Sequence, residues 1–243
     1  MPTRQPLPPA APHPPARPRV TAIMVSSLDG AGTAGGRGSQ GLSTPADRML
    51  FRSLRRSADA VLVGAGTVRD EDYRGVRRRR PTTDDPTPGE PPPVVVVTGS
   101  ADLAPDAALL TDTITPPIVL TTGGAPAARR AALAAAGADV VVLPDLRPGP
   151  LLAELGRRGL RSVLCEGGPT LLGALVAADA VDELRLTLVP VLVGGPAGRI
   201  ATGPVAPAVP RGMRLAGHDA APDGTLLLHY VRGDVRGDHP PNG

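Results

Sequence analysis

Residues 163–173 carry the clearest chemical signal in the sequence. An apolar run, Val-Leu-Cys, breaks into Glu166-Gly167-Gly168-Pro169 and then resumes with the apolar spacing of a helix. This pattern predicts a strand, a tight glycine turn and a helix start, whose free backbone N–H groups attract phosphate oxygens. Glu166 then falls at the carboxyl end of the strand, which is where open α/β sheets bind their ligands.

Residues 60–68 repeat this organisation. A β-rich apolar run ends in Gly64-Ala65-Gly66 and is followed by the hydroxyl of Thr67. Two such turns suggest one cofactor cleft, although either turn alone is more often a plain connection than a cofactor site. Two familiar motifs are excluded, because a G-x-G-x-x-G fingerprint needs glycine where the chain has Arg69, and a P-loop needs lysine, which the chain lacks.

Size and composition limit the class of protein. With 243 residues, 41% of them hydrophobic, the chain can form one α/β domain with a buried core. The net charge is only +3 and the isoelectric point is ≈ 9.9, with arginine supplying the basic side chains. The aromatic residues are Phe51, Tyr73 and Tyr230, so the stacking platforms of RNA and single-strand binders are missing. We therefore expect no nucleic-acid partner.

Cysteine, histidine and apolar runs indicate the compartment. Cys165 is the only cysteine, which excludes an intramolecular disulfide, agrees with a reducing compartment and is interpreted as a small buried hydrophobe. The four histidines are scattered and give no metal-ligand spacing. No apolar run reaches the roughly eighteen residues of a membrane span, and no signal peptide is evident. We expect a cytoplasmic protein with no metal and no membrane partner.

The chain divides into a single domain with two tails. Residues 1–18 are rich in proline and residues 233–243 are polar, so both ends are expected to be disordered. Residues 19–232 form the folded domain. Within it, residues 78–93 are expected to be a flexible insertion, because they combine arginine, proline, threonine and aspartate without apolar periodicity.

The apolar pattern predicts an α/β fold with a mostly parallel central sheet, flanking helices and an antiparallel C-terminal edge. Thr44 and Pro45 are expected to begin the first helix as its cap and first-turn residue, and Asp223-Gly224 to form the turn of a C-terminal hairpin. The expected strands are 20–26, 60–64, 94–98, 117–121, 139–143, 161–165 and 184–193, with the hairpin at 213–218 and 225–231. The expected helices are 45–57, 126–136, 149–157 and 169–177.

The order of several motifs resembles a known family, the pyrimidine reductase domain of riboflavin biosynthesis, in the dihydrofolate reductase-like superfamily. The motifs are Ser27-Leu-Asp29-Gly30, Ser39-Gln40 before a helix with Arg48 and Arg55, residues 60–68, and Glu166-Gly-Gly-Pro-Thr170. The resemblance covers residues 20–231. It implies NADPH-dependent reduction of the ribosylamino group of a phosphorylated diaminopyrimidinone, with hydride transfer to a C1′ imine, by a homodimer.

The resemblance also implies roles for individual residues. Asp29 and Glu166 are the expected catalytic residues. The expected substrate-binding residues are Ser39, Arg55 and Arg77. The expected cofactor-binding residues are Val25, Gly64, Gly66, Thr67, Glu71, Gly167, Gly168, Pro169, Thr170, Leu171 and Leu172. Forked arginine donors suit a 5′-phosphate, Glu166 suits ring N–H or amino donors, and Asp29 suits ribose hydroxyls or the protonation of the imine.

Other interpretations remain open. Arg55 could be a solvent-facing charge and Asp29 a turn residue before glycine. The sequence also departs from the family pattern, with Ile23 at a common lysine position, Gly41 at a common tryptophan position and Tyr73 at a common proline position. One rival function is a related reductase of a dihydropterin or another imine or carbonyl compound. Another is a non-catalytic anion or nucleic-acid binder that uses the arginine run 77–80.

The preference between NADPH and NADH is not decided by the sequence. Residues 99–101, which follow the strand 94–98, are Gly-Ser-Ala and contain no arginine to bind a 2′-phosphate.

Overall fold

The computed structural model describes residues 17–36, 38–77, 89–204, 207 and 209–233. A sheet of nine strands runs through this part of the chain, in the order β5-β4-β3-β2-β6-β1-β7-β9-β8. The first seven in this order are parallel, while β9 is antiparallel to both β7 and β8. The strands are β1 Arg19–Ser27, β2 Ala60–Gly64, β3 Val94–Val97, β4 Ile118–Thr122, β5 Asp139–Leu143, β6 Ser162–Cys165, β7 Glu183–Val189, β8 Met213–Ala220 and β9 Leu226–Arg232. The predicted fold class is confirmed.

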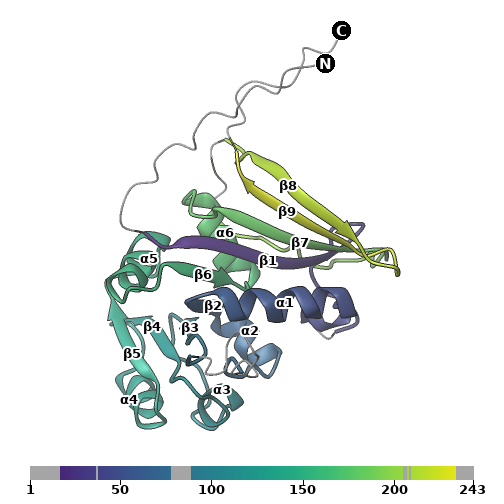
Figure 1. Ribbon diagram of the computed structural model, residues 1–243. Coiled ribbons are helices and arrows are strands. Elements are labelled where there is room, and N and C mark those ends of the chain that lie inside the picture. Colours follow the sequence, from purple (N-terminus) through teal and green to yellow (C-terminus); the bar gives the residue numbers. More distant parts are fainter. Residues whose placement is uncertain (1–16, 37, 78–88, 205–206, 208, 234–243) are drawn as a thin grey trace.

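Helices cover both faces of the parallel part of the sheet (Figure 1). The helices α5 and α6 lie on one face, and α1 to α4 lie on the other. The helical elements are η1 Gly38–Gly41, α1 Pro45–Ser57, α2 Ala65–Asp70, α3 Ala108–Thr111, α4 Ala127–Ala135, α5 Pro148–Arg157 and α6 Pro169–Ala177. The central strands are apolar on both sides because both of their faces are covered.

Alternation along the strands divides the core. In β2, Ala60 and Leu62 point toward the leucines of α5 and α6, whereas Val61 and Val63 point toward α2 and α3. All four are fully buried. Burial of these side chains stabilises β2 between the two layers of helices.

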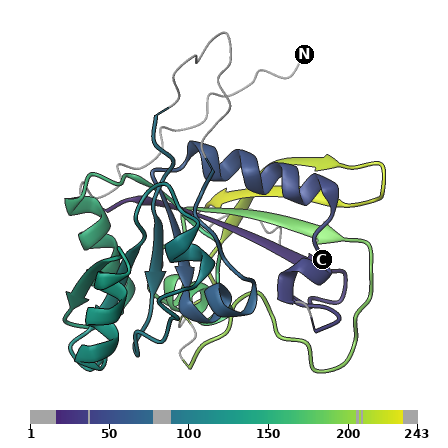
Figure 2. The same cartoon turned by 90° about the horizontal axis from the view of Figure 1, so that it is seen from below.

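Helix α1 attaches to the sheet through polar contacts. Its predicted start is confirmed, because Thr44 Oγ1 accepts a hydrogen bond from Asp47 N at 3.3 Å and Pro45 follows in the first turn. The Asp47 carboxylate is buried and accepts hydrogen bonds from Thr187 on β7 and from Ser43. Met49 on α1 is 70% exposed, so it adds little to this attachment. Viewed from below, α1 (blue) lies across the sheet (Figure 2).

Three local expectations differ from the structure. The strand expected at 184–193 ends at Val189, because Pro190 has no N–H to continue the ladder. Helix α2 begins directly after Gly64, where a glycine turn alone was expected, because the packing of Ala65 and Val68 stabilises a short helix. The glycine-rich loop before α1 contains the short helix η1.

The edges of the expected tails and insertion are partly ordered. Arg17 pairs with Asp182, and the carbonyl of Pro93 accepts a hydrogen bond from Val61 N on β2. The carbonyl of Pro91 accepts one from Thr115 Oγ1. Residues 1–16, 78–88 and 234–243, and with them most of both expected tails and of the expected insertion, lie outside the described residues.

Candidate active site

The two glycine turns lie side by side at the carboxyl ends of β2 and β6. These strands are neighbours, with Leu62 opposite Cys165. Gly64 N donates to the carbonyl of Gly167 at 2.8 Å, and Gly168 N donates to Thr67 Oγ1 at 3.0 Å. The structure therefore joins the two turns into one surface, as expected from their shared pattern.

Three glycines of this surface differ in the space around them. A side chain would be crowded at Gly167 and Gly168, whereas the space beside Gly66 is open. Gly167 has a φ of +94°, and a Cβ there would lie 3.1 Å from Met24 Cε. A Cβ on Gly168 would lie 3.0 Å from Thr67 Oγ1. A Cβ on Gly66 would meet no atom within 4 Å among the described residues. The surface beside Gly66 is thus accessible to a ligand.

Helix α6 begins at this surface with Pro169. Its first N–H groups, those of Thr170 and Leu171, have no intrahelical partner by the geometry of a helix start. Pro169 and Thr170 are exposed, whereas the side chains of Leu171 and Leu172 are buried in the core. The backbone of this turn, and not the two leucine side chains, is therefore what a ligand can contact.

A buried ion pair lies beside the turns. Arg55 on α1 donates from Nε and Nη2 to the two carboxylate oxygens of Glu166, at 2.7 and 2.6 Å. The Glu166 side chain is 2% exposed and that of Arg55 is 16% exposed. Arg55 was expected to bind substrate and Glu166 to be catalytic at the substrate. The structure brings together Arg55 on α1 and Glu166 at the end of β6.

Burial governs the electrostatics of Glu166. Burial raises the pKa of Glu166 above its ordinary value, the charge and hydrogen bonds of Arg55 oppose the rise, and the nearby charge of Glu71 adds to it. The geometry is that of an ionised carboxylate paired with a guanidinium, but a proton is held more readily here than in water. A carboxyl group with these properties suits the binding of donor groups on a heterocycle.

Two further predicted residues bind each other. Ser39 donates from both its hydroxyl and its backbone N–H to Glu71 Oε1, at 2.6 and 3.1 Å. Ser39 belongs to η1 and Glu71 follows α2. This contact links the loop before α1 to the segment after the second glycine turn, on the side of the site where the charge of Glu71 reaches Glu166.

Asp29 anchors a loop. Its carboxylate accepts hydrogen bonds from Ser27 Oγ and from the backbone N–H groups of Val193 and Gly194. The hydrogen bonds from Ser27, Gly194 and Val193, in this order, lower the pKa of Asp29 to about 2. The segment that follows β7 (green in Figure 2) is thereby held at the end of β1. In this arrangement Asp29 has the role of a turn and loop anchor at the ligand-binding edge.

Val25 and Arg77 are placed apart from the ion pair. Val25 is buried against Leu42 and Val189. Arg77 is exposed and pairs with Asp112. It lines a hollow of ≈ 480 Å³ at the amino-terminal ends of the strands, since the other lining residues precede β2, β3, β4 and β6. Arg77 therefore lies at the edge opposite Glu166, because residues 71–77 cross from one edge of the sheet to the other.

The structure also brings forward arginines that the sequence pattern missed. Arg69 on α2 donates to the carbonyl of Asp102 at 2.9 Å, and Arg129 on α4 pairs with the carboxylate of Asp102 at 3.3 Å. Both flank the loop after β3, where no arginine was found in the local sequence. Only the packing of α2 and α4 around this loop reveals them, so no local sequence signal could have done so.

Two general findings concern the described residues. Within them, no helix is long and apolar enough to cross a membrane. The same part of the chain contains no cluster of three or more His, Cys, Asp or Glu side chains arranged for a metal ion.

The sheet and the joined turns define an α/β protein with a mostly parallel sheet, a class in which ligands bind at the carboxyl edge of the strands. The family model described as the RibD C-terminal domain matches residues 18–227. The chain belongs to this family, and the resemblance found in the sequence is confirmed.

Sequence relatives are of two lengths. The riboflavin biosynthesis protein RibD of Mycobacterium tuberculosis is 31% identical over 179 residues, which cover 74% of this chain and 44% of that protein. The chain thus spans less than half of this relative. The 2,5-diamino-6-ribosylamino-4(3H)-pyrimidinone 5′-phosphate reductase of Archaeoglobus fulgidus is 31% identical over 182 residues, covering 74% of this chain and 83% of that protein.

Solved structures share the fold. A pyrimidine reductase-like protein from Corynebacterium diphtheriae superposes with a TM-score of 0.72 and 23% identity, over 88% of this chain and 92% of that one. Acinetobacter baumannii RibD gives a TM-score of 0.73 and 23% identity, over 89% of this chain and 58% of that one.

Proposed function

We propose that this protein is an NADPH-dependent reductase of riboflavin biosynthesis that reduces the ribosylamino group of a phosphorylated pyrimidine to the ribitylamino product. The observation that carries the proposal is the buried Arg55–Glu166 pair beside two joined glycine turns. Family membership and relatives named as reductases of such a pyrimidinone phosphate support it. The single buried cysteine supports a cytoplasmic setting.

The cofactor fits the joined turns. Bound NADPH supplies the hydride that the reaction requires. The N–H groups of Thr170 and Leu171 at the start of α6 suit the pyrophosphate oxygens, and the open side of Gly66 admits the close approach of a ligand. Gly64, Gly167, Gly168 and Thr67 shape this surface through their mutual hydrogen bonds.

The preference for NADPH is proposed to rest on Arg69 and Arg129. Their guanidinium groups flank the loop after β3, and a 2′-phosphate needs such forked donors. Asp102 contacts both arginines, with its backbone carbonyl on Arg69 and its carboxylate on Arg129, and a bound phosphate would compete with that carboxylate for Arg129.

The substrate is proposed to contact Glu166 and Arg55. The carboxylate of Glu166 accepts hydrogen bonds from ring N–H or amino groups, while Arg55 holds the carboxylate in place and offers donors to substrate oxygens. With the ring fixed in this way, the sugar C1′ can be aligned for hydride transfer, so that positioning supplies most of the catalysis. Ser39 and Glu71 close one side of the site, and Asp29 contributes by holding the loop 193–194.

A homodimer is part of the proposal. Leu184, Tyr230 and Leu215 form a row across β7, β9 and β8, and Leu215 is 45% exposed at its outer end. A second copy of the chain would cover this antiparallel edge. Light scattering at micromolar concentration measures the mass directly, and a monomer would contradict this part.

The experiment that tests the function combines binding with turnover. NADPH and NADH are titrated by fluorescence, and oxidation of the better ligand is then followed with the phosphorylated diaminopyrimidinone and with a dihydropterin. Turnover of the pyrimidine alone supports the proposal, and turnover of the dihydropterin alone supports the related reductase. Absence of NADPH binding at millimolar concentration contradicts both.

A pair of glycine variants locates the cofactor. Gly66→Ala places a methyl group in open space on α2, so it should weaken NADPH binding without loss of stability. Gly149→Ala on α5, where the added Cβ also meets nothing within 4 Å, is the matched control. Gly167→Val is a poorer probe because the left-handed φ of +94° disfavours a β-branched residue. Equal NADPH affinity of both alanine variants would place the cofactor elsewhere.

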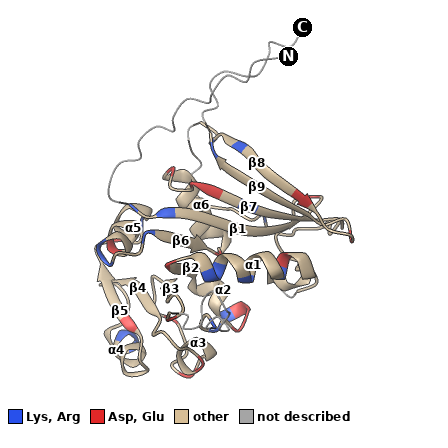
Figure 3. Cartoon of the chain, in the orientation of Figure 1, with Lys and Arg blue, Asp and Glu red and all other residues tan. Residues whose placement is uncertain are grey.

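The binding-protein alternative has less support. Acidic and basic residues are interspersed over the described elements rather than gathered on one face (Figure 3), and Arg77 is already paired with Asp112. Salt-dependent DNA binding in the absence of NADPH binding would favour this alternative.

A further inference from the structure

Aromatic residues are scarce in this chain, yet two of them meet at one arginine. The sequence contains one phenylalanine and two tyrosines. The Arg55 guanidinium carbon lies 4.4 Å from the ring centre of Phe51 and 4.9 Å from that of Tyr73. Both distances allow cation–π contact, so the two rings hold the guanidinium that pairs with Glu166.

The Tyr73 hydroxyl is buried without a partner. Tyr73 is 7% exposed, and its ring packs in the core cluster of Val61, Val63 and Val68. Its phenolic oxygen has no hydrogen-bond partner among the described residues. Buried hydroxyl groups are normally hydrogen-bonded because an unmade bond is unfavourable. The structure thus contains an unpartnered hydroxyl group on the ring that packs against the Arg55 guanidinium.

The backbone directs this side chain inward. Asp72 has a φ of +46°, in the left-handed region, and Tyr73 N then donates to the carbonyl of Val68 at 3.2 Å. This turn reverses the chain after α2 and brings the ring against Arg55. Asp72 tolerates the conformation better than most residues, but it is still an uncommon one.

Arg55 also has unused donors. Two of its five N–H groups donate to Glu166. The others have no hydrogen bond within the described part of the chain. A guanidinium can only donate, whereas a phenol can donate or accept, so both groups can bind the same ligand oxygen.

We propose that the Tyr73 hydroxyl, together with the N–H groups of Arg55 that Glu166 leaves unused, binds an acceptor oxygen of the substrate. This inference rests on the proposed function. The oxygen belongs to a ring carbonyl or to the phosphate. A carbonyl next to a ring N–H matches the donor and acceptor that Arg55 and Glu166 place side by side, and a phosphate matches the positive charge. Tyr73 is then a substrate-binding residue at the position where the sequence departs from the family pattern.

The test is Tyr73→Phe, which keeps the ring and removes only the hydroxyl. The control is Thr111→Val on α3, which also removes one hydroxyl group while keeping the shape of the side chain. KM, kcat, the Kd of NADPH and the melting temperature are measured for both variants and for the wild type, at a temperature where all are folded. Tyr73→Phe should raise KM for the pyrimidine substrate by roughly fivefold to twentyfold, the effect of one lost hydrogen bond. Its NADPH affinity and melting temperature should not fall, and Thr111→Val should leave KM, kcat and the Kd of NADPH unchanged.

A second arm identifies the oxygen. The same variants are compared with the dephosphorylated substrate. If Tyr73→Phe shows the same loss with this substrate, the hydroxyl binds the ring carbonyl, and if the loss disappears, it binds the phosphate. Both results support the inference.

Two results overturn it. If the wild type turns over the pyrimidine and Tyr73→Phe matches it in KM, the inference fails while the proposed function stands. If the wild type neither binds nor reduces the pyrimidine, the proposed function fails and the inference fails with it.

Discussion

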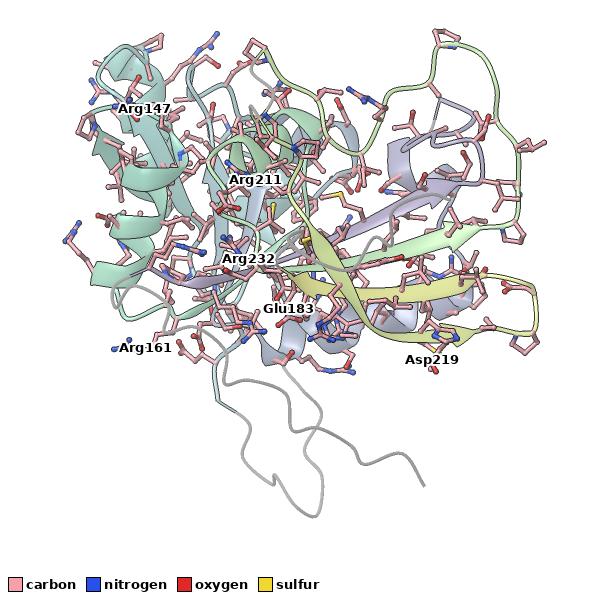
Figure 4. All side chains as sticks on the ribbon, turned by 90° about the horizontal axis from the view of Figure 1, so that it is seen from above. Arg147, Arg161, Glu183, Arg211, Asp219 and Arg232 are labelled. Atoms are coloured by element: carbon pink, nitrogen blue, oxygen red, sulfur yellow. The ribbon has the colours of Figure 1, made fainter. Side chains whose placement is uncertain are left out.

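Two buried carboxylates, at opposite edges of the sheet, have arginine partners but different surroundings. Within the described residues, the carboxylate of Glu166 at the carboxyl edge accepts hydrogen bonds from Arg55 alone. Asp182 at the amino-terminal end of β1 receives two hydrogen bonds from Arg17 and one from Val20 N, with Arg232 at 3.6 Å. Arg232 also pairs with Asp179, as does Arg211 (both arginines are labelled in Figure 4).

The pKa values of the two groups shift in opposite directions. Burial raises the pKa of Glu166 and Arg55 does not compensate fully. Burial also pushes the pKa of Asp182 upward, but the hydrogen bonds of Arg17 and Val20 and the charges of Arg17 and Arg232 bring it below its ordinary value. The comparison teaches that hydrogen bonds and charges within the fold compensate the burial of the Asp182 carboxylate. They compensate the burial of the Glu166 carboxylate only in part, which leaves it able to bind a donor group of a ligand.

The largest effect is expected from Glu166→Gln. The change keeps size and removes charge, so kcat/KM for the pyrimidine should fall by roughly ten- to a hundredfold, or about 1.4–2.8 kcal/mol of transition-state binding. The NADPH Kd should change little. Asp182→Asn, assayed under folded conditions, should keep normal turnover. Normal turnover in Glu166→Gln with a lower melting temperature would refute the substrate role.

The stability of the fold should depend on Asp182, which is not expected to affect turnover. Asp182→Asn removes the charge that Arg17 and Val20 N bind, and should lower the free energy of unfolding by about 1–3 kcal/mol. The control Asp179→Asn changes a carboxylate that is 44% exposed and should cost less than about 1 kcal/mol. Chemical denaturation measures all three proteins. If the two variants lost equal free energy of unfolding, the buried, fully hydrogen-bonded Asp182 would contribute no more to stability than the exposed Asp179, and the prediction would be wrong.

The pH dependence of stability sharpens the same contrast. A lowered pKa means that the contribution of Asp182 is complete above its unfolded value of 3.8 and is lost as the pH falls below it. A raised pKa means that Glu166 binds its proton more tightly in the folded state, so its contribution declines as the pH rises above 4.5.

Unfolding is therefore measured across pH for the wild type and both variants. The stability advantage of the wild type over Asp182→Asn should shrink toward acid. Its stability relative to Glu166→Gln should decline as the pH rises. The same pH trend in both comparisons would contradict the opposite pKa shifts.

A smaller effect is expected on cofactor choice. Arg69→Ala and Arg129→Ala should each raise the Kd of NADPH by roughly fivefold, the factor for about 1 kcal/mol from an exposed charge pair. The Kd of NADH should not change, because it lacks the 2′-phosphate. Arg147→Ala, an exposed arginine paired with Asp145, is the control. An equal loss for both cofactors would remove the two arginines from 2′-phosphate binding.

The smallest effect concerns Cys165, next to Glu166. Burial raises the pKa of its thiol to about 11, so alkylating reagents should not modify the folded protein at neutral pH. Mass spectrometry should detect the adduct only after unfolding. Rapid modification of the native protein would mean that the end of β6 opens readily.

Local sequence patterns predicted most of the sheet and the glycine turns of the candidate site. The valine-rich runs of β2 and β3 and the Gly-Gly-Pro break after β6 have local causes, namely alternation, backbone freedom and proline geometry. Helix α2 was missed because Gly-Ala-Gly-Thr has the composition of a turn, and its helix depends on the packing of Val68.

The contacts of individual side chains were less predictable. Arg55 and Glu166 were both chosen from motifs, but their separation of 111 residues gave no sign that they bind each other. Arg77 was expected beside them and lies at the opposite edge, because the chain after α2 crosses the sheet. Tyr73 was noted only as a departure from a pattern.

By itself, the sequence determined the α/β fold and the two glycine turns, because these depend on the period of apolar residues and on backbone preferences within a few positions. The family was indicated by the resemblance of its motifs. The tertiary structure decided which charges meet. The strand order places β6 between β2 and β1, α1 crosses that region, and only then do Arg55, Glu166 and Tyr73 share one buried site. Electrostatic and hydrogen-bond energies depend on distance and burial in space, which separation along the chain does not specify.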